Sequence, residues 1–381
     1  MDISLRTLSK TLGRAACSSS AIFSSVRLNN ILAYSALFAS LLVSTNALAA
    51  TQTYFIAIEE IEWEYFPSTD QPAVALDKSQ RTSTNSSANR VGTGYRKVIY
   101  RGYTDESFTT VSPQPAAQGI LGPTLRVQVG DTLNVVLRNN AARPYTMTIQ
   151  GLSTENKNNS DKKTITAAIE PSETRTLRWN IEPESGPGPA DKSSVAWQYF
   201  SNVSKEKDMH SGLVGAVIVS RRGLGRRNGP PLDVDREFVL LTALSNENIS
   251  WHASDNLRRL KNNNPERKGE RYYASNMMAN INGYMHDTLP PLDMNACEKV
   301  RLYHLRLSSQ PADLGLELTD NTLLRDGHRT TTISTPVSTI SVADFSPTKT
   351  GPHAFSAAGE GLAEAGIYAH FTVNPPTLDC E

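Results

Sequence analysis

The stretch from Trp197 to Val219 reads WQYFSNVSKEKDMHSGLVGAVIV and decides the fold of its half of the chain. A polar, charge-rich segment runs to Ser211, and an apolar run follows from Leu213 to Val219. A polar segment followed by an apolar run without helical periodicity is typical of a loop that leads into a buried strand. The stretch therefore predicts a loop and the last strand of a β-domain.

The rest of the chain repeats this pattern. Short runs rich in β-branched and aromatic residues recur between Gly, Pro and Asn, and few stretches have a helical period, which favours an all-β sandwich or barrel. The predicted strands are Tyr54–Glu59, Arg96–Tyr100, Thr124–Val129, Thr132–Leu137, Val214–Val219, Phe238–Ala243, Val300–Leu305, Thr331–Ile340 and Ile367–Val373. Polar insertions at 71–94 and 152–163 are expected to be surface loops.

Two related β-domains are expected. The segment Leu121–Leu137 has a weaker echo in Leu289–Tyr303, because each places a Pro turn before an apolar position, a polar turn and an alternating strand. A stretch rich in Arg, Gly and Pro separates the two halves. We predict domains at 51–222 and 233–381, joined by a linker at 223–232.

The N-terminal segment 1–50 is predicted to be a signal peptide. Scattered basic residues precede the apolar run Ile31–Val43, and the small residues Ala47 and Ala49 flank Leu48 at the expected cleavage site. An uncleaved signal anchor is the alternative, although the run is shorter than the roughly 20 residues that a spanning helix needs. We expect a secreted, extracellular protein.

Composition and cysteine usage agree with export. The 38 basic and 38 acidic residues balance, so no nucleic-acid partner is expected. The mature chain would keep only Cys297 and Cys380, which most simply pair in an oxidising compartment. Asparagines in Asn-x-Ser/Thr sequons supply candidate glycosylation sites, namely Asn85, Asn158, Asn202 and Asn248.

Motifs spread over almost the whole mature chain carry a family resemblance. In order, they are Tyr54–Tyr65, Tyr103–Phe108, Gly119–Pro123, Arg143–Thr146, Ser211–Gly215, Glu247–Trp251 and Ile281–Tyr284. With the stretch quoted above, they resemble an A domain of the ceruloplasmin, hephaestin and coagulation factor V/VIII family, closest to the third A domain of the two factors. The resemblance implies two tandem cupredoxin-like Greek-key β-sandwiches, and a disulfide in the second between Cys297 and Cys380.

The same resemblance places copper ligands at positions that lack them here. Where copper-binding relatives have histidines in the first half, this chain has Thr148, Gln150, Phe200 and Asn202. In the second half the blue-copper His, Cys and His positions fall on Leu314, Ala357 and Leu362, with Ile367 near the axial position. A blue-copper site needs a thiolate and two imidazoles, so the copper sites are predicted to be lost and no catalytic residue is expected.

Our expectation from sequence is a non-enzymatic, secreted binding module or cofactor-like scaffold. The resemblance implies an extracellular protein partner, such as a serine protease or its substrate, and calcium binding with no assigned ligands. Independent membrane binding is not expected. Cleavage is a hypothesis at Arg222 and Arg227, which belong to dibasic pairs near the linker. The alternatives are a ferroxidase-like multicopper oxidoreductase with copper ligands shared with another chain, and a structural component of the extracellular matrix.

Overall fold

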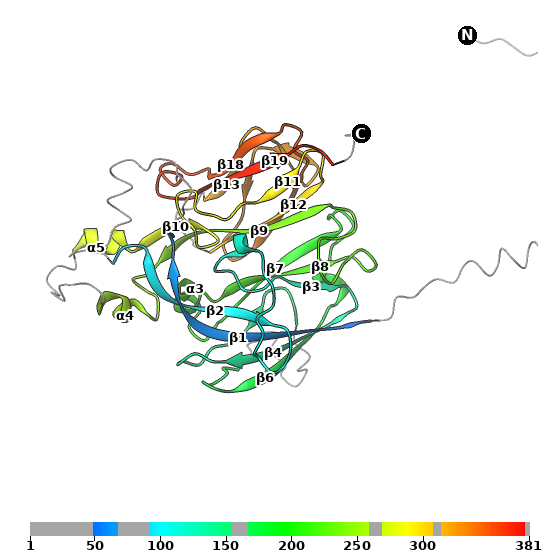
Figure 1. The fold of residues 1–381 in the computed structure, drawn as a ribbon. Coiled ribbons are helices and arrows are strands. Elements are labelled where there is room, and N and C mark those ends of the chain that lie inside the picture. The colour runs from blue at the N-terminus through cyan, green and yellow to red at the C-terminus, as the bar shows by residue number, and fades with distance from the viewer. Residues whose placement is uncertain (1–48, 68–90, 154–166, 259–268, 308–313, 378–381) are drawn as a thin grey trace, which may run out of the picture. The chain divides into compact units, whose positions relative to one another are not determined.

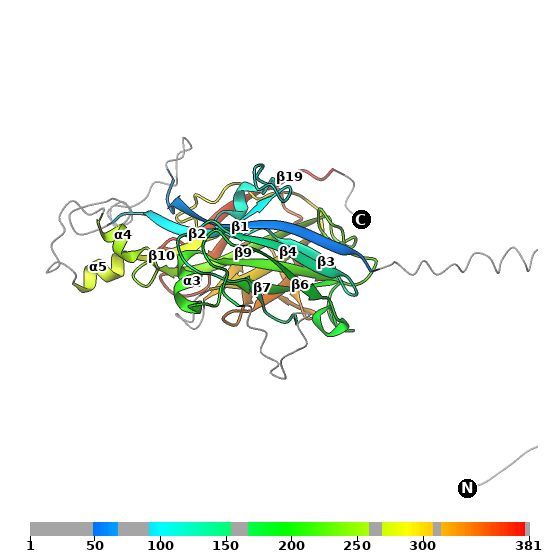
Figure 2. The ribbon, with the colours of Figure 1, turned by 90° about the horizontal axis from the view of Figure 1, so that it is seen from below.

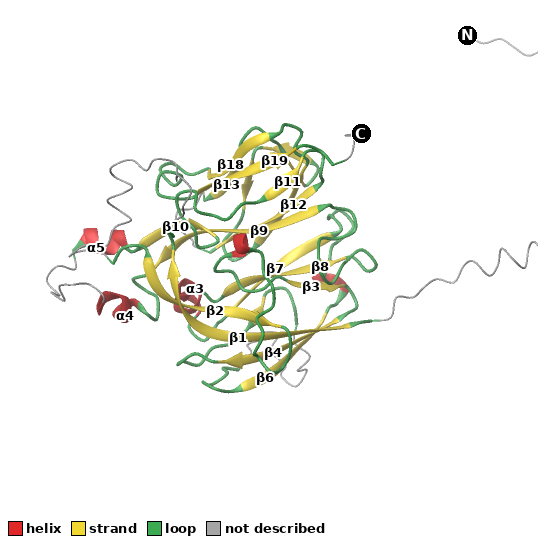
Figure 3. Cartoon of the chain, in the orientation of Figure 1, coloured by secondary structure: helices red, strands yellow, loops and turns green. Residues whose placement is uncertain are grey.

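The computed structural model describes residues 49–67, 91–153, 167–258, 269–307 and 314–377. The sequence predictions that lie wholly or mostly outside this part of the chain are the signal peptide, the surface loops at 71–94 and 152–163, the sequons at Asn85 and Asn158, and Cys380. The described residues belong to one compact unit. It is built of curled β-sheets (Figures 1 and 3), so the all-β prediction is confirmed.

The first half of the unit contains two four-stranded sheets. The first has the order β2-β1-β4-β6, from β1 (Thr51–Glu64), β2 (Gly94–Tyr103), β4 (Thr132–Asn139) and β6 (Thr174–Asn180). The second has the order β3-β8-β7-β5, from β3 (Leu125–Gln128), β5 (Thr148–Ile149), β7 (Ser194–Phe200) and β8 (Val214–Ser220). The buried residues of β4 alternate strictly with half-buried ones, so one face of the strand packs into the core between the two sheets.

The second half repeats the two-layer plan with larger sheets. A six-stranded sheet has the order β10-β9-β12-β17-β14-β15, from β9 (Arg236–Asn246), β10 (Met277–Ile281), β12 (Val300–Arg306), β14 (Leu323–Arg325), β15 (His328–Thr330) and β17 (Ile340–Phe345). A five-stranded sheet has the order β11-β19-β18-β13-β16, from β11 (Asp293–Asn295), β13 (Gly315–Leu318), β16 (Thr332–Ser334), β18 (Gly351–Ala357) and β19 (Tyr368–Asn374). No sheet mixes described strands from the two halves. The boundaries of the predicted domains stay a prediction.

The halves pack through the second face of the β7–β8 pair. Ala196 and Ile218 from this pair form a buried cluster with Tyr303 of β12, and Ile340 and Val342 of β17 pack against it. All seven residues of β8 are buried, because one face covers the core of the first half and the other face covers the second half. Figure 1 places β7 and β8 next to β9 and β12, at the junction of the two halves.

Helices in the described part are short. They are α3 (Lys205–Ser211), α4 (Ala253–Arg258) and α5 (Glu270–Ser275), with single 3₁₀ turns at Ala116–Gln118 and Pro183–Ser185. In Figures 1 and 2, α4 and α5 lie at one end of the molecule. No described helix is both long enough and apolar enough to span a bilayer.

Two local predictions from sequence are wrong. The segment predicted as a loop ahead of β8 forms α3, and Asp208 in it is fully buried. Its carboxylate accepts hydrogen bonds from Ser201 Oγ and the Ser204 N–H, which hold the start of the helix. The single strand predicted at Thr331–Ile340 is interrupted, because β16 ends at Ser334 and β17 begins at Ile340. Pro336, in the gap, has no N–H for a strand ladder.

Candidate functional site

The first-half positions that align with copper ligands meet on two neighbouring strands. Thr148 of β5 lies directly opposite Phe200 of β7, and the Gln150 N–H donates to the Gln198 carbonyl at 2.9 Å. At the other end of the pair, the Asn202 N–H donates to Thr146 Oγ1. The strand register therefore brings the four aligned positions together.

Their side chains do not form a copper donor set. Phe200 is buried among apolar residues, with the Lys205 ammonium 4.8 Å from its ring centroid. Thr148, Gln150 and Asn202 supply a hydroxyl and two amides rather than imidazoles or thiolates. Within the described ranges no group of three or more His, Cys, Asp or Glu could hold a metal. Copper therefore does not fit these residues of this chain alone, while the loss of the copper sites stays a prediction.

The second-half positions also come together, in an apolar environment. Leu314, Ala357 and Ile367 belong to one buried cluster, and Leu362 packs against it. The Ala357 N–H donates to the Ile367 carbonyl at 2.9 Å, and the Ile367 N–H donates to the Leu362 carbonyl at 3.0 Å. Aliphatic side chains fill the place where the resemblance implies a blue-copper site, and they contribute packing there.

The histidines of the described part are dispersed, and several have partners of their own. His304 lies between the hydroxyls of Thr242 and Thr335 at 2.9 and 2.7 Å, and burial lowers its pKa to about 3. His370 is half-exposed, and its Nδ1 lies 2.8 Å from Asp287 Oδ2. A carboxylate on one ring nitrogen orients the other nitrogen outward, which is an arrangement common in metal-binding histidines.

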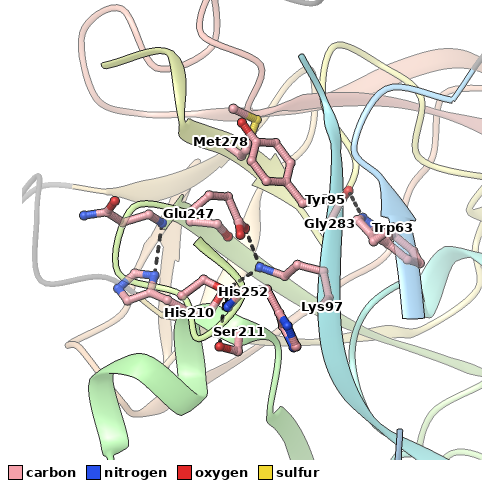
Figure 4. A network of polar contacts seen from close by, with 12 residues as sticks. Trp63, Tyr95, Lys97, His210, Ser211, Glu247, His252, Met278 and Gly283 are labelled. Carbon is pink, nitrogen blue, oxygen red and sulfur yellow. Dashed lines mark hydrogen bonds and ion pairs between the residues drawn. The ribbon is translucent and has the colours of Figure 1, made fainter. Parts of the chain in front are cut away.

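A buried ion pair that sequence analysis missed joins the two halves. Lys97 lies in β2 and Glu247 directly follows β9, and Lys97 Nζ contacts Glu247 Oε1 (Figure 4). Both side chains are only 1% exposed. Lys97 also donates to the His210 carbonyl at 2.6 Å, and Tyr65 Oη donates to Glu247 Oε1 at 2.7 Å. Burial lowers the pKa of Lys97, an effect that the Glu247 carboxylate opposes. No sequence pattern links two residues 150 positions apart.

Further polar contacts surround this pair. His210 Nδ1 accepts a hydrogen bond from the Asn246 N–H at 3.1 Å, and burial, followed by the Lys97 charge, lowers the pKa of His210 to about 4. Trp63 Nε1 donates to the Gly283 carbonyl at 2.8 Å (Figure 4). We interpret this cluster as a structural connection between the halves, since its central charges are closed to solvent.

The remaining site predictions fall on residues with varied surroundings. Cys297 is disulfide-bonded, and its predicted pairing with Cys380 stays a prediction. Asn248 Nδ2 donates to Asn246 Oδ1 and to the Tyr273 carbonyl, so a glycan at Nδ2, which replaces one of its two hydrogens, would remove one of these bonds. Arg222 and Arg227 are exposed. Glycosylation and cleavage stay predictions.

Sequence comparison identifies relatives of this chain. A family model described as multicopper oxidase matches residues 109–223. The chain is 35% identical to ferroxidase HEPHL1 of Homo sapiens over 270 residues, which are 68% of this chain and 23% of that protein. It is 32% identical to ceruloplasmin of Mus musculus over 295 residues (72% and 28%), and 36% identical to coagulation factor V of Sus scrofa over 252 residues (63% and 11%).

This chain contains a multicopper oxidase-family domain related to hephaestin, ceruloplasmin and factor V. The family resemblance found in the sequence is confirmed, and the finer likeness to the third A domain of factors V and VIII stays a prediction. The chain spans about a quarter of the length of the ferroxidases that it matches.

Solved structures agree on the fold of the family domain. Copper nitrite reductase from Nitrosomonas europaea has a TM-score of 0.55 at 16% identity, covering 87% of this chain and 96% of that one. A multicopper oxidase has a TM-score of 0.53, also at 16% identity, covering 85% and 89%. These neighbours confirm the cupredoxin-like architecture.

The expectation that this chain is not an enzyme is wrong. It rested on missing ligand residues at single aligned positions. The relatives include ferroxidases at 35% identity over two thirds of the chain, which point to an oxidoreductase. Missing ligands within one chain do not decide the class of the whole protein, because a metal site can draw ligands from more than one chain.

Proposed function

We propose that this chain is part of a ferroxidase-like oxidoreductase whose copper is held by ligands from this chain together with ligands from a second chain. The observation that carries the proposal is the 35% identity to a ferroxidase over 68% of the chain. The described residues contain no group of three or more potential ligands, so a complete site needs donors from elsewhere. The proposal therefore requires a partner.

His370 is the donor that this chain offers best. Its backbone N–H and its Nδ1 both bond Asp287, at 2.6 and 2.8 Å, so the carboxylate fixes the imidazole from one side. The side chain is 48% exposed, which leaves the ring accessible to a neighbouring molecule. His328 is exposed as well, but no carboxylate holds its ring in the described part of the chain. A fixed imidazole loses less conformational entropy when it binds a metal.

The partner that we propose is a second extracellular chain. The apolar N-terminal run and the sequons support secretion of this chain. The zero net charge argues for a partner chosen by shape and local contacts rather than by long-range attraction. A serine protease or its substrate, which the likeness to coagulation factors suggests, is a second class of partner that capture experiments would distinguish. Calcium stays a candidate ion without assigned ligands.

The test is elemental analysis of the full secreted chain, alone and after co-expression with a ferroxidase relative. We expect substoichiometric copper in the isolated chain, and added copper together with Fe(II) oxidation in the complex. Replacing His370 by Asn should lower the copper content of the complex, while the matched replacement of His328 by Asn should not. A full equivalent of copper in the isolated chain would contradict ligand sharing. The absence of both copper and Fe(II) oxidation from every complex would contradict the proposal that this chain is part of an oxidoreductase.

A further inference from the structure

A cavity of about 500 Å³ lies between the two halves, and neither Lys97 nor Glu247 belongs to its lining. One wall is β7 from Ser194 to Gln198, and the opposite wall is the segment Thr339–Val342 at the start of β17. Cavities of this size accommodate small organic molecules. The cavity takes no part in the function proposed above, and its residues suggest a ligand of their own.

Two glutamines lie side by side in the lining. Gln150 and Gln198 both line the cavity, and the backbone bond between them makes them cross-strand neighbours. Directly opposed residues of antiparallel strands point to the same face, so both amides lie on the face that is turned to the second half. The cavity thus has two adjacent amide side chains in its lining.

The amide of Gln198 has unused hydrogen-bonding capacity. The residue is 1% exposed, and neither its Oε1 nor its Nε2 has a hydrogen-bond partner within the described residues. Thr148 Oγ1 is likewise buried without a partner, on the same face of the β5–β7 pair. Buried polar atoms without partners are costly, so a group that supplied both a donor and an acceptor would be bound favourably here.

The charges around the opening select against anions. Three acidic and two basic side chains line it, which leaves one net negative charge. Both basic groups are already paired, Lys192 with Asp344 at 3.1 Å and Arg325 with Asp326 at 3.3 Å. A phosphate or a carboxylate would find no unpaired cation in the lining. The side chains of Ala196, Ile340 and Val342 add apolar surface.

We propose that this cavity binds a small, uncharged, planar molecule of the carboxamide class, with Gln198 as its polar anchor. The primary amide of such a ligand can donate to Oε1 and accept from Nε2 at the same time, which satisfies both atoms of Gln198. Because both atoms are buried, the ligand reaches them through a change of the Gln198 rotamer. The apolar side chains pack against the planar part of the ligand.

The experiment is titration of the full chain with nicotinamide, followed by NMR of glutamine side-chain NH₂ groups. The Gln198 resonances are assigned by their absence from the Gln198→Leu variant. We expect saturable shifts of these resonances with a dissociation constant of about 1–10 mM, as befits a very small ligand. Gln198→Leu should weaken nicotinamide binding at least tenfold, measured by saturation transfer to the ligand.

Two controls keep the proposal falsifiable. Gln52→Leu alters a half-buried glutamine of β1, in the sheet that does not line the cavity, and should leave nicotinamide binding unchanged. Nicotinate, which has the same ring with a carboxylate, should bind at least fivefold more weakly. Thermal melting checks that both variants are folded. The proposal is overturned if nicotinamide does not saturate, if folded Gln198→Leu binds it as the unaltered chain does, or if nicotinate binds equally well.

Discussion

Removing one charge of the Lys97–Glu247 pair should destabilise this protein strongly. Replacing Glu247 by Gln keeps the size and the acceptor oxygen but leaves the Lys97 ammonium buried without a counter-charge. Both side chains are 1% exposed, so water does not screen the loss. Breaking one side of a buried pair costs about 3–5 kcal/mol, because the remaining ion stays desolvated. We expect the free energy of unfolding to fall by this amount.

The assay is urea unfolding of the full chain, followed by tryptophan fluorescence. The double replacement of Lys97 by Met and Glu247 by Leu removes both charges, and should recover most of the loss because apolar residues of similar volume replace a desolvated pair. The matched control is Arg96→Met, next to Lys97 in β2. Arg96 pairs with Glu60 at 2.5 Å, but its side chain is 43% exposed, so the loss should be about 0–1 kcal/mol.

Two results would refute this reasoning. If the free energy of unfolding of Glu247→Gln lies within about 1 kcal/mol of that of the unaltered chain, the buried pair contributes no more than an exposed ion pair does. If the double variant is as unstable as Glu247→Gln, the loss comes from packing or hydrogen bonds at Glu247 rather than from an unpaired charge.

Three further predictions concern pH, packing and proteolysis. The pKa of His210 is about 4 in the folded protein, against 6.5 for a free histidine, so this residue is protonated at a higher pH in the unfolded chain than in the folded one. The free energy of unfolding should therefore fall as the pH drops from 6.5 to 4. In the variant His210→Asn this fall should be smaller by about 2–3 kcal/mol, measured by urea unfolding at both pH values. Gly215→Ala should lower the free energy of unfolding by about 1–3 kcal/mol in the same assay, because an added Cβ would lie 2.2 Å from Tyr199 Cζ. An unchanged urea midpoint would mean that the Tyr199 ring moves aside freely. Limited trypsin digestion, read by mass spectrometry, should cut first at the exposed arginines of 221–227, and a first cut within 71–94 would contradict a cleavable linker.

Local pattern predicted several of the longer strands, because their buried faces alternate or are continuously apolar. Val214–Val219 became β8 almost residue for residue, and Thr132–Leu137 became most of β4. Among the strands that the pattern missed is β7, whose last four residues, Trp197–Phe200, begin the stretch that decides the fold. This strand places Ser194 and Gln198 on the face toward the second half, so its polar residues resemble those of a loop. Only the tertiary arrangement explains their burial.

The positions that align with copper ligands lie close together in the structure, as the alignment implies. They could be located from sequence because the family motifs define the register of neighbouring strands. No local sequence pattern indicated the contacts between the two halves. Lys97 is one of three basic residues of β2, beside Arg96 and Arg101, and no sequence pattern distinguishes it as the one that pairs with Glu247. The enzyme class failed for a different reason. The ligand residues of this chain do not determine the activity, because the chain spans only about a quarter of the length of the ferroxidases that it matches.

The junction between the halves uses polar contacts as well as apolar packing, and one of them links the junction to the cavity. Arg301, 1% exposed, bonds Asp344 at 2.8 Å and Ser194 Oγ of β7 at 2.8 Å, and therefore ties the two sheets at a defined spacing. Asp344 also pairs with Lys192 at the edge of the cavity. Directional contacts tolerate little sliding, whereas apolar faces alone would allow several packings. The spacing that Arg301 sets is thus also the spacing between the cavity walls, so a change that separates the halves should abolish nicotinamide binding even with Gln198 in place.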